Sequence, residues 1–344
     1  MKKNSYLIYI FFFFIITSCN KCNHENPLSK VDVSKIDVVD VKIHRYERAL
    51  IKVNPRTIKE DLKALQPEYK FFLEGDLNDP NNLQQMKSFI TDPLFNELYQ
   101  DGIKIYPDLS DLEKQLTMAF KHIKYYFPKE RIPKVYSYIS IFDFEEPIKY
   151  SSDSVLIIAL DMYFGSKYKN YSQLMLPDGT IGIPSFKAFS YKKEFIVPDC
   201  MREIAKTKVD YNKSCKSFLE EMIYQGKILY FVDAMMPDAP DTLKVEFPSK
   251  KLDWCKKNES SIWAFFIDKK LLYSADQHKY NKFINDGPFT SAFGKDSPAR
   301  TGSWIGWQII KKYMVNNPNI SLQQMLDDYD AQRILSMSGY KPKK

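Results

Sequence analysis

The chain has 344 residues and a mass of 40.5 kDa, which excludes a disulfide-stapled miniprotein and fits one large domain or two medium ones. Its 44% apolar and 27% charged residues are typical of globular proteins and exclude wholesale disorder. The net charge of +7 is not concentrated in any long run of lysine or arginine, so nucleic-acid binding is not indicated.

The N-terminus has the features of an export signal. Two lysines precede an unbroken apolar run of eleven residues, 6–16, which is shorter than the roughly 20 residues that span a bilayer. The sequence Ile-Thr-Ser-Cys follows at 16–19, with an apolar and two small residues before a cysteine, as in the bacterial lipobox. We therefore predict a lipoprotein signal peptide over residues 1–18 and lipid attachment at Cys19.

The segment after the signal is predicted to be a tether. Residues 19–37 are mostly polar and lack helical periodicity. No internal repeat or low-complexity linker follows, so residues 38–344 are expected to form a single globular domain.

Surface-export signals in related bacteria tend to be acidic, and no acidic run follows Cys19. A lipid-anchored location in the cell envelope, in the outer membrane and facing the periplasm, is therefore expected.

The first elements are a strand and two helices. Residues 38–46 begin Val-Val-Asp-Val-Lys-Ile and predict a strand. Asn54-Pro55 and Asp92-Pro93 each combine an N-cap residue with a helix-starting proline, and the second helix is expected to reach about Ile105.

A longer helix is predicted over 110–127, where apolar residues recur at spacings of three and four. Ser110 and Glu113 have the spacing of a capping box. His122 lies off the apolar stripe, so we expect a surface or half-buried position for it.

Two β segments follow this helix. Residues 135–142 and 154–161 are rich in β-branched, aromatic and aliphatic residues, and the polar stretch 143–153 separates them. This pattern predicts an antiparallel pair joined by a long loop. The second strand is apolar on both faces, so helices are expected to cover it.

The C-terminal half is expected to be mostly helical. Within it, Gly302 and Gly306 lie four residues apart and Trp304 and Trp307 flank them, so we predict that another backbone packs closely against this face. Ser297-Pro298 predicts the start of that helix. The expected helices are 185–190, 196–207, 216–236, 250–267, 298–315 and 321–327.

No catalytic or metal-ligating residue can be assigned from local spacing. Zinc peptidases place two histidines four apart on one helix face, and no pair of the four histidines has that spacing. No glycine-flanked serine of the hydrolase type is present. We therefore expect no enzymatic activity and no cofactor. Buried thiols and disulfides both remain open for the four cysteines beyond Cys19, and their pairing is not decided: Cys22, Cys200, Cys215 and Cys255.

Longer motifs in the second half resemble the gliding-motility lipoprotein GldB family of Bacteroidetes. They are EMIYQGKILYF at 221–231, SPARTGSWIGWQ at 297–308 and NPNISLQQ at 317–324, with the β segments at 135–164 in the expected place. The resemblance covers nearly the whole mature chain. It implies an envelope protein of the gliding machinery and its linked secretion system, with protein partners there. Motif positions without an assigned role are Tyr230, Arg300, Gly302, Trp304 and Gly306.

The GldB family is in turn distantly similar to zincin-like peptidases, which implies an α+β, mostly helical fold with an antiparallel strand pair packed against a helical C-terminal half. In those enzymes an HExxH helix follows the strands, and a second helix supplies a glutamate ligand. Here the first helix would lie near 197–203 without either histidine, and Gln225 stands where that glutamate would be. Asp199, Glu203 and Gln225 are therefore the candidate positions of a degenerate site.

These observations leave three functions open. The main hypothesis is a non-enzymatic envelope protein that binds an extended segment of a partner protein in a cleft between strands 135–161 and helices 196–236. The first alternative is a divergent zinc metallopeptidase. The second is a solute- or glycan-binding lipoprotein that stacks a sugar on one of its tryptophans: Trp254, Trp263, Trp304 or Trp307.

Overall fold

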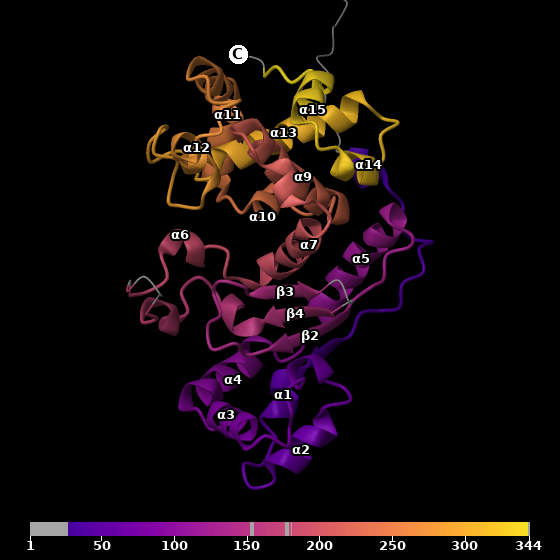
Figure 1. Ribbon diagram of the computed structural model, residues 1–344, viewed down its shortest axis with the longest axis vertical. Coiled ribbons are helices and arrows are strands. Elements are labelled where there is room, and N and C mark those ends of the chain that lie inside the picture. The colour runs from indigo at the N-terminus through magenta and orange to yellow at the C-terminus, as the bar shows by residue number, and fades with distance from the viewer. Residues whose placement is uncertain (1–26, 152–154, 176–178, 180, 343–344) are drawn as a thin grey trace, which may run out of the picture.

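The computed structural model describes residues 27–151, 155–175, 179 and 181–342 (Figure 1). The predicted signal peptide, Cys19 and Cys22 lie outside these residues. In the described part no helix is long and apolar enough to cross a membrane.

A small mixed sheet lies in the middle of the molecule, in the order β1-β2-β4-β3. β1, β2 and β4 run parallel, and β3 runs antiparallel to β4. The strands are β1 (Ile43–Arg45), β2 (Lys134–Tyr138), β3 (Ile148–Ser151) and β4 (Val155–Ala159).

The predicted antiparallel pairing of the segments 135–142 and 154–161 is wrong. The polar stretch between them, expected to be a loop, contains β3, and this extra strand forms the antiparallel pair with β4. Two reversals of chain direction separate β2 from β4, so these two strands run parallel. The predicted class, mostly helical α+β with an antiparallel pair, is confirmed.

The N-terminal third supplies helices to both sides of the sheet. Asp92 caps α4 through the backbone N–H of Leu94, as predicted. The helix expected at Asn54-Pro55 starts later, at Ile58, because the Asn54 side chain accepts from the Arg56 N–H and holds a turn instead. The elements are α1 (Tyr46–Leu50), α2 (Ile58–Leu65), the 3-10 turn η2 (Lys70–Phe72), α3 (Pro80–Ile90), α4 (Pro93–Ile105) and α5 (Ser110–Tyr126).

Two details of α5 differ from the prediction. Ser110 and Glu113 form no capping box, since Glu113 instead accepts from the backbone N–H of Ile43 and so ties α5 to β1. His122 is buried, and its Nδ1 lies 3.0 Å from the carbonyl oxygen of Met118.

The second half is helical, close to the predicted ranges. Ser321 and Gln324 form a complete capping box at α14. The helices are α6 (Ser185–Ala188), α7 (Ile196–Lys206), α8 (Tyr211–Ser214), α9 (Phe218–Met235), α10 (Asp241–Val245), α11 (Ser249–Asp268), α12 (Gln277–Ile284), α13 (Thr301–Asn316), α14 (Leu322–Asp327) and α15 (Ala331–Ser338). The shorter 3-10 turns are η1 (Pro27–Lys30), η3 (Leu160–Tyr163), η4 (Lys169–Ser172) and η5 (Lys193–Phe195).

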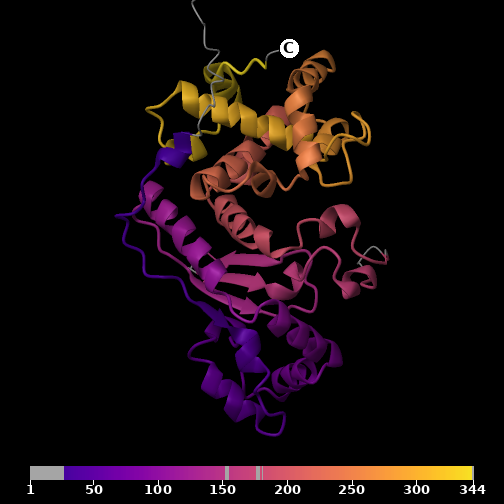
Figure 2. The same ribbon diagram turned by 180° about the vertical axis from the view of Figure 1, so that it is seen from behind.

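These elements form three tiers along the long axis (Figures 1 and 2). We call α1–α4 the N-terminal tier, below the sheet in Figure 1, and α9–α15 the C-terminal tier, above it. α5 and α7 lie between the sheet and the C-terminal tier, and α7 contacts β3 and β4 directly. The sheet therefore has different helices on its two faces.

The folded part begins before residue 38. Leu28, Val33 and Val41 are buried, and Leu28 belongs to the hydrophobic core. Part of the segment predicted as a tether, residues 27–37, therefore packs against the domain.

The glycines of α13 are sites of close helix packing, as predicted. A Cβ at Gly306 would lie 1.8 Å from the carbonyl oxygen of Met222, and one at Gly226 would lie 2.4 Å from the backbone of Gly306. α9 and α13 thus cross with their backbones in contact. Because only glycine permits this approach, both positions require it.

The start of α13 differs from the prediction. Ser297 does not cap the helix; its hydroxyl group donates to the carbonyl oxygen of Gly294 at 2.7 Å. The helix begins at Thr301, and Arg300 precedes it in the left-handed region, with φ of 52°.

Candidate functional site

α7 places Asp199 and Arg202 one turn apart, so both side chains lie on one helix face. Asp199 accepts from the Arg202 guanidinium through Oδ1 and from the Tyr163 hydroxyl through Oδ2, the latter at 2.8 Å. The Asp199 side chain is 15% exposed. The carboxylate is therefore engaged on both oxygens in a largely buried position.

Two residues from distant segments extend this contact into a network. Arg300 donates to Glu246 Oε2 at 2.8 Å, and Arg202 lies 3.3 Å from Glu246 Oε1. We call Tyr163, Asp199, Arg202, Glu246 and Arg300 the charged network. It joins η3, α7, the residue after α10 and the residue before α13.

Both Glu246 and Arg300 adopt left-handed backbone conformations, with φ of 56° and 52°. A side chain other than glycine, asparagine or aspartate rarely adopts this conformation, which costs roughly 1–2 kcal/mol. The salt bridge between the two residues holds both segments in it. The network therefore stores backbone strain where three helices meet.

Burial, helped by the neighbouring carboxylate of Glu246, raises the pKa of Asp199 to about 7 against the opposing effect of Arg202. Burial would also raise the pKa of Glu246, but the guanidinium groups of Arg202 and Arg300 outweigh it and lower that pKa to about 2. One carboxylate is thus firmly ionised, and the other is close to protonation at neutral pH.

A small cavity of about 40 Å³ adjoins the network, lined in part by Arg202, Gln225, Arg300 and Ser303. One water molecule needs about 10–15 Å³, so the cavity has room for a few waters but not for a substrate or a peptide. The hydroxyl group of Ser303 is buried here without a hydrogen-bond partner in the described part of the chain.

The structure brings together only part of the predicted degenerate site. Asp199 contacts Arg202, and Gln225 lines the same small cavity, while its amide donates to Glu221 at 3.1 Å. Glu203 points elsewhere and pairs with Lys206 at 2.5 Å. Among the described residues, no three His, Cys, Asp or Glu side chains gather closely enough to hold a metal ion.

The other motif positions pack in the core. Tyr230 is buried, and burial raises its pKa above the ordinary value. Gly302 lies against the Phe218 ring and the Phe283 carbonyl group. Trp304 and Trp307 are 1% and 0% exposed, so neither offers a face on which a sugar could stack.

The remaining tryptophans are half-buried against other rings. Trp254 lies 6.0 Å from the ring of Phe293, and Trp263 lies 5.2 Å from that of Tyr340.

Three of the cysteines whose pairing the sequence left open are free thiols. Cys200 and Cys255 are fully buried, and Cys215 is half-buried. Burial raises the pKa of Cys200 well above its ordinary value, so this thiol is not primed as a nucleophile.

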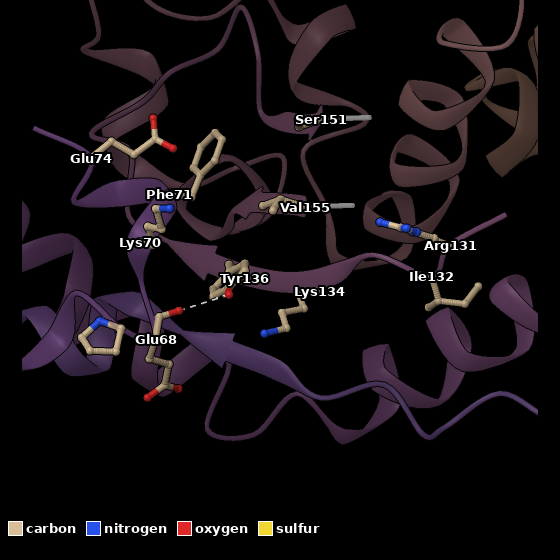
Figure 3. A pocket seen from close by; sticks show the side chains of 11 residues that line it. Glu68, Lys70, Phe71, Glu74, Arg131, Ile132, Lys134, Tyr136, Ser151 and Val155 are labelled. Atoms are coloured by element: carbon tan, nitrogen blue, oxygen red, sulfur yellow. Dashed lines mark hydrogen bonds between the residues drawn. The ribbon is translucent and has the colours of Figure 1, made fainter. Parts of the chain in front are cut away.

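A much larger groove, of about 980 Å³, lies between the sheet and the segment that joins α2 to α3 (Figure 3). Lys134, Val155 and Ser151 are neighbours in register across β2, β4 and β3, so their side chains share one face of the sheet. We call this cavity the sheet groove. Its lining residues are Pro67, Glu68, Lys70, Phe71, Glu74, Arg131, Ile132, Lys134, Tyr136, Ser151 and Val155.

The wall of the sheet groove opposite the strands is the segment between α2 and α3. The Tyr136 hydroxyl donates to the Glu68 carbonyl oxygen at 3.1 Å and so ties this segment to β2 (Figure 3). The Phe72 ring packs 6.0 Å from that of Tyr136, whereas Phe71 is 43% exposed. Phe72 thus holds the wall against the sheet, whereas its neighbour Phe71 remains accessible to a ligand.

The sheet groove carries more free cations than free anions. Lys70, Arg131 and Lys134 are exposed, and none of the three forms an ion pair within the described residues. Of the two acids, Glu68 is engaged by His44 at 3.0 Å. The groove therefore favours a ligand that combines negative charge with an apolar side chain.

The groove is not where the sequence placed the cleft. No residue of 196–236 lines it, and α7 instead packs directly on β3 and β4. Residues 67–74 and 131–132 were missed as candidates. A signal was present in Lys-Phe-Phe at 70–72 and Arg-Ile-Pro-Lys at 131–134, but nothing local indicated that the two segments meet.

Comparison with known families gives one match. A sequence model of a family described as gliding motility protein GldB matches residues 26–342, nearly the whole chain. No curated protein and no solved structure matches the chain.

Proposed function

Because the chain belongs to the gliding motility protein GldB family, we propose that it is a lipid-anchored cell-envelope protein that supports gliding motility and the linked secretion machinery without catalysing a reaction. In this proposal the anchor is Cys19, in the outer membrane and on the periplasmic side. The domain holds an extended segment of a partner envelope protein. The observation that carries the binding role is the sheet groove.

The anchor is supported by the sequence that precedes the domain. The apolar run 6–16 and the cysteine at 19 suit a lipoprotein signal, and the family match begins shortly afterwards, at residue 26. Acyl chains on Cys19 would then hold the domain at the membrane.

The sheet groove suits an extended segment with acidic residues beside an aromatic or aliphatic one. Lys70, Arg131 and Lys134 supply charge that carboxylates would neutralise, and the exposed Phe71 ring supplies apolar contact. A cavity of this volume accommodates several side chains of a bound peptide.

The absence of catalysis is supported by the way the candidate acid is held. Asp199 is engaged by the Tyr163 hydroxyl and by Arg202, so both of its carboxylate oxygens are already held by protein groups.

Binding can be tested with acidic-aromatic peptides of about eight residues and the purified protein, followed by fluorescence anisotropy. The triple variant Lys70→Glu/Arg131→Glu/Lys134→Glu should weaken binding at least tenfold. A matched control, Lys250→Glu/Lys257→Glu/Lys269→Glu, makes the same charge change at exposed lysines on α11 and directly after it, and should leave affinity within twofold. An equal loss of peptide affinity in both variants, or no binding of any peptide, would contradict the proposal that the sheet groove is the binding site.

The anchor and the enzyme alternative have separate tests. Mass spectrometry of the mature protein should find acyl chains on Cys19, and Cys19→Ala should release the protein from the membrane fraction.

Elemental analysis addresses the metallopeptidase, because stoichiometric zinc in the purified protein would overturn the non-enzymatic role. Crosslinking in the native envelope should recover a gliding or secretion component, and recovery of lipid and peptidoglycan alone would count against the partner.

A further inference from the structure

The described chain begins in the C-terminal tier. Pro27 starts η1, Leu28 is buried, and both views show this indigo segment beside α14 (Figures 1 and 2). Cys19 stands only eight residues before Pro27. A fully extended chain spans at most about 3.6 Å per residue, so a lipid on Cys19 lies within about 29 Å of this segment.

The surface at this end carries two exposed apolar side chains. Val315, near the end of α13, is 55% exposed, and Met337, near the end of α15, is 43% exposed. The two helix ends are joined, since the Asn316 amide donates to the Ser338 carbonyl at 2.7 Å and the Asn317 amide donates to that of Met337 at 3.2 Å. Val315 and Met337 therefore belong to one corner of the molecule.

Two lysines flank this corner. Lys312 precedes Val315 by three residues and Lys341 follows Met337 by four, and both are exposed. Apolar side chains bordered by ammonium groups are typical of surfaces that rest on a bilayer. The apolar groups enter the boundary of the acyl chains, while the lysine stems reach the headgroups.

We propose that this corner, formed by Lys312, Val315, Met337 and Lys341, rests on the membrane that carries the lipid anchor. The proposal builds on the predicted anchor at Cys19. The occupant is a lipid surface, because the tether is too short to carry this end far from the bilayer. One wall of the sheet groove is the segment between α2 and α3, which lies on the other side of the sheet from the C-terminal tier (Figure 1). In this orientation the groove is directed away from the membrane and toward a partner.

The test uses the full-length lipidated protein in vesicles of phosphatidylethanolamine and phosphatidylglycerol. Cys22→Ser and Cys215→Ser first remove the thiols that are not known to be fully buried. A fluorophore is then placed at Ser336→Cys, beside the corner, or at Glu74→Cys, in the sheet groove. Quenching by lipids that carry a nitroxide in the acyl chain should be at least threefold stronger at position 336 than at 74.

A matched pair of variants examines the corner itself. Val315→Asp/Met337→Asp should lower quenching at position 336 at least twofold. Met118→Asp, which alters an exposed apolar residue on α5, should leave it unchanged. Circular dichroism of each variant establishes that the fold is intact.

The outcomes separate this inference from the anchor. Lipidated protein with equal quenching at both positions, or stronger quenching at 74, overturns the orientation and leaves the anchor standing. Protein without acyl chains on Cys19 overturns both. Unchanged quenching in Val315→Asp/Met337→Asp overturns the role of the corner.

Discussion

The N-terminal and C-terminal tiers are stabilised in different ways. In the C-terminal tier, α9 and α13 meet backbone to backbone at Gly226 and Gly306, and the buried Lys227 donates to the carbonyl groups of Leu326 and Asp328. In the N-terminal tier the close contacts are between side chains: the atoms nearest to a Cβ added at Gly75 or Gly102 belong to side chains, and the rings of Tyr46 and Phe72 stack with centroids 4.2 Å apart. The C-terminal tier therefore depends on a helix crossing that leaves no room for an added atom. The ring contacts of the N-terminal tier tolerate replacement by another side chain with a smaller loss of stability.

This difference suits a division of roles. A rigid C-terminal tier can hold the strained residues Glu246 and Arg300 in place and present a fixed surface to the bilayer. The N-terminal tier keeps charged and aromatic side chains exposed around the sheet groove. The predictions below test this contrast, from the largest expected effect to the smallest.

Gly306→Ala should be the most damaging single change. The new methyl group would lie 1.8 Å from the Met222 carbonyl oxygen, so α9 and α13 must separate. We expect a loss of about 3 kcal/mol or more in the free energy of unfolding, measured by urea denaturation. Gly287→Ala is the control, because its nearest contact would be 3.9 Å away, and it should change stability by no more than about 0.5 kcal/mol. Similar losses in both variants would refute the close packing.

Glu246→Ala should rank second. It leaves the guanidinium groups of Arg202 and Arg300 without their shared carboxylate in a largely buried place, at a cost of about 3 kcal/mol. Glu203→Ala, which removes a partner from a more exposed pair with Lys206, should cost about 0.5 kcal/mol or less. A comparison of the two melting temperatures distinguishes these expectations, and equal shifts would contradict the central role of the charged network.

The raised pKa of Asp199 predicts a pH dependence of intermediate size. A carboxyl group whose pKa rises from 3.8 to about 7 on folding binds its proton more tightly in the folded state. Its contribution to stability is therefore fully present below about pH 4 and is lost progressively as the pH rises to about 7, by a few kcal/mol. Urea denaturation between pH 4 and 7.5 should reveal this decline in the wild type and a flatter profile in Asp199→Asn. Parallel profiles would rule out this assignment.

The smallest effect on stability is expected in the sheet groove. Phe71→Ala should change the free energy of unfolding by about 0.5 kcal/mol or less, because the ring is exposed. Phe72→Ala should cost about 2 kcal/mol, since this ring packs on Tyr46, Tyr136 and Tyr138. Thermal denaturation of Phe71→Ala and Phe72→Ala compares the exposed ring of the groove wall with its packed neighbour. A loss for Phe71→Ala as large as that for Phe72→Ala would contradict an accessible binding surface.

Local patterns in the sequence identified most of the helices. Asp92-Pro93 and the Ser321–Gln324 capping box act within one turn of chain, so the residues that decide the structure are also neighbours in sequence. The close packing at Gly306 was predictable for a similar reason, because glycine inside a helix is unfavourable unless a neighbour requires it.

The pairing of strands and the composition of the sites could not be read in this way. β3 is short and polar enough to resemble a loop, and it is a strand because β4 offers it an edge. Ser297 has the sequence position of an N-cap, but its hydroxyl group satisfies the Gly294 carbonyl group. Arg300 starts the helix in a left-handed conformation, with its side chain held by Glu246 and by the Val245 carbonyl group.

The sequence by itself determined the family and the mostly helical class, since each is carried by contiguous residues or short-range spacing. Tertiary structure alone decided that the Asp199–Arg202 pair meets Tyr163, Glu246 and Arg300, and that residues 67–74 and 131–136 enclose the groove. The physical reason is distance along the chain: partners separated by tens of residues leave no periodic signal, and only the packing of the sheet between two unlike helical tiers brings them together.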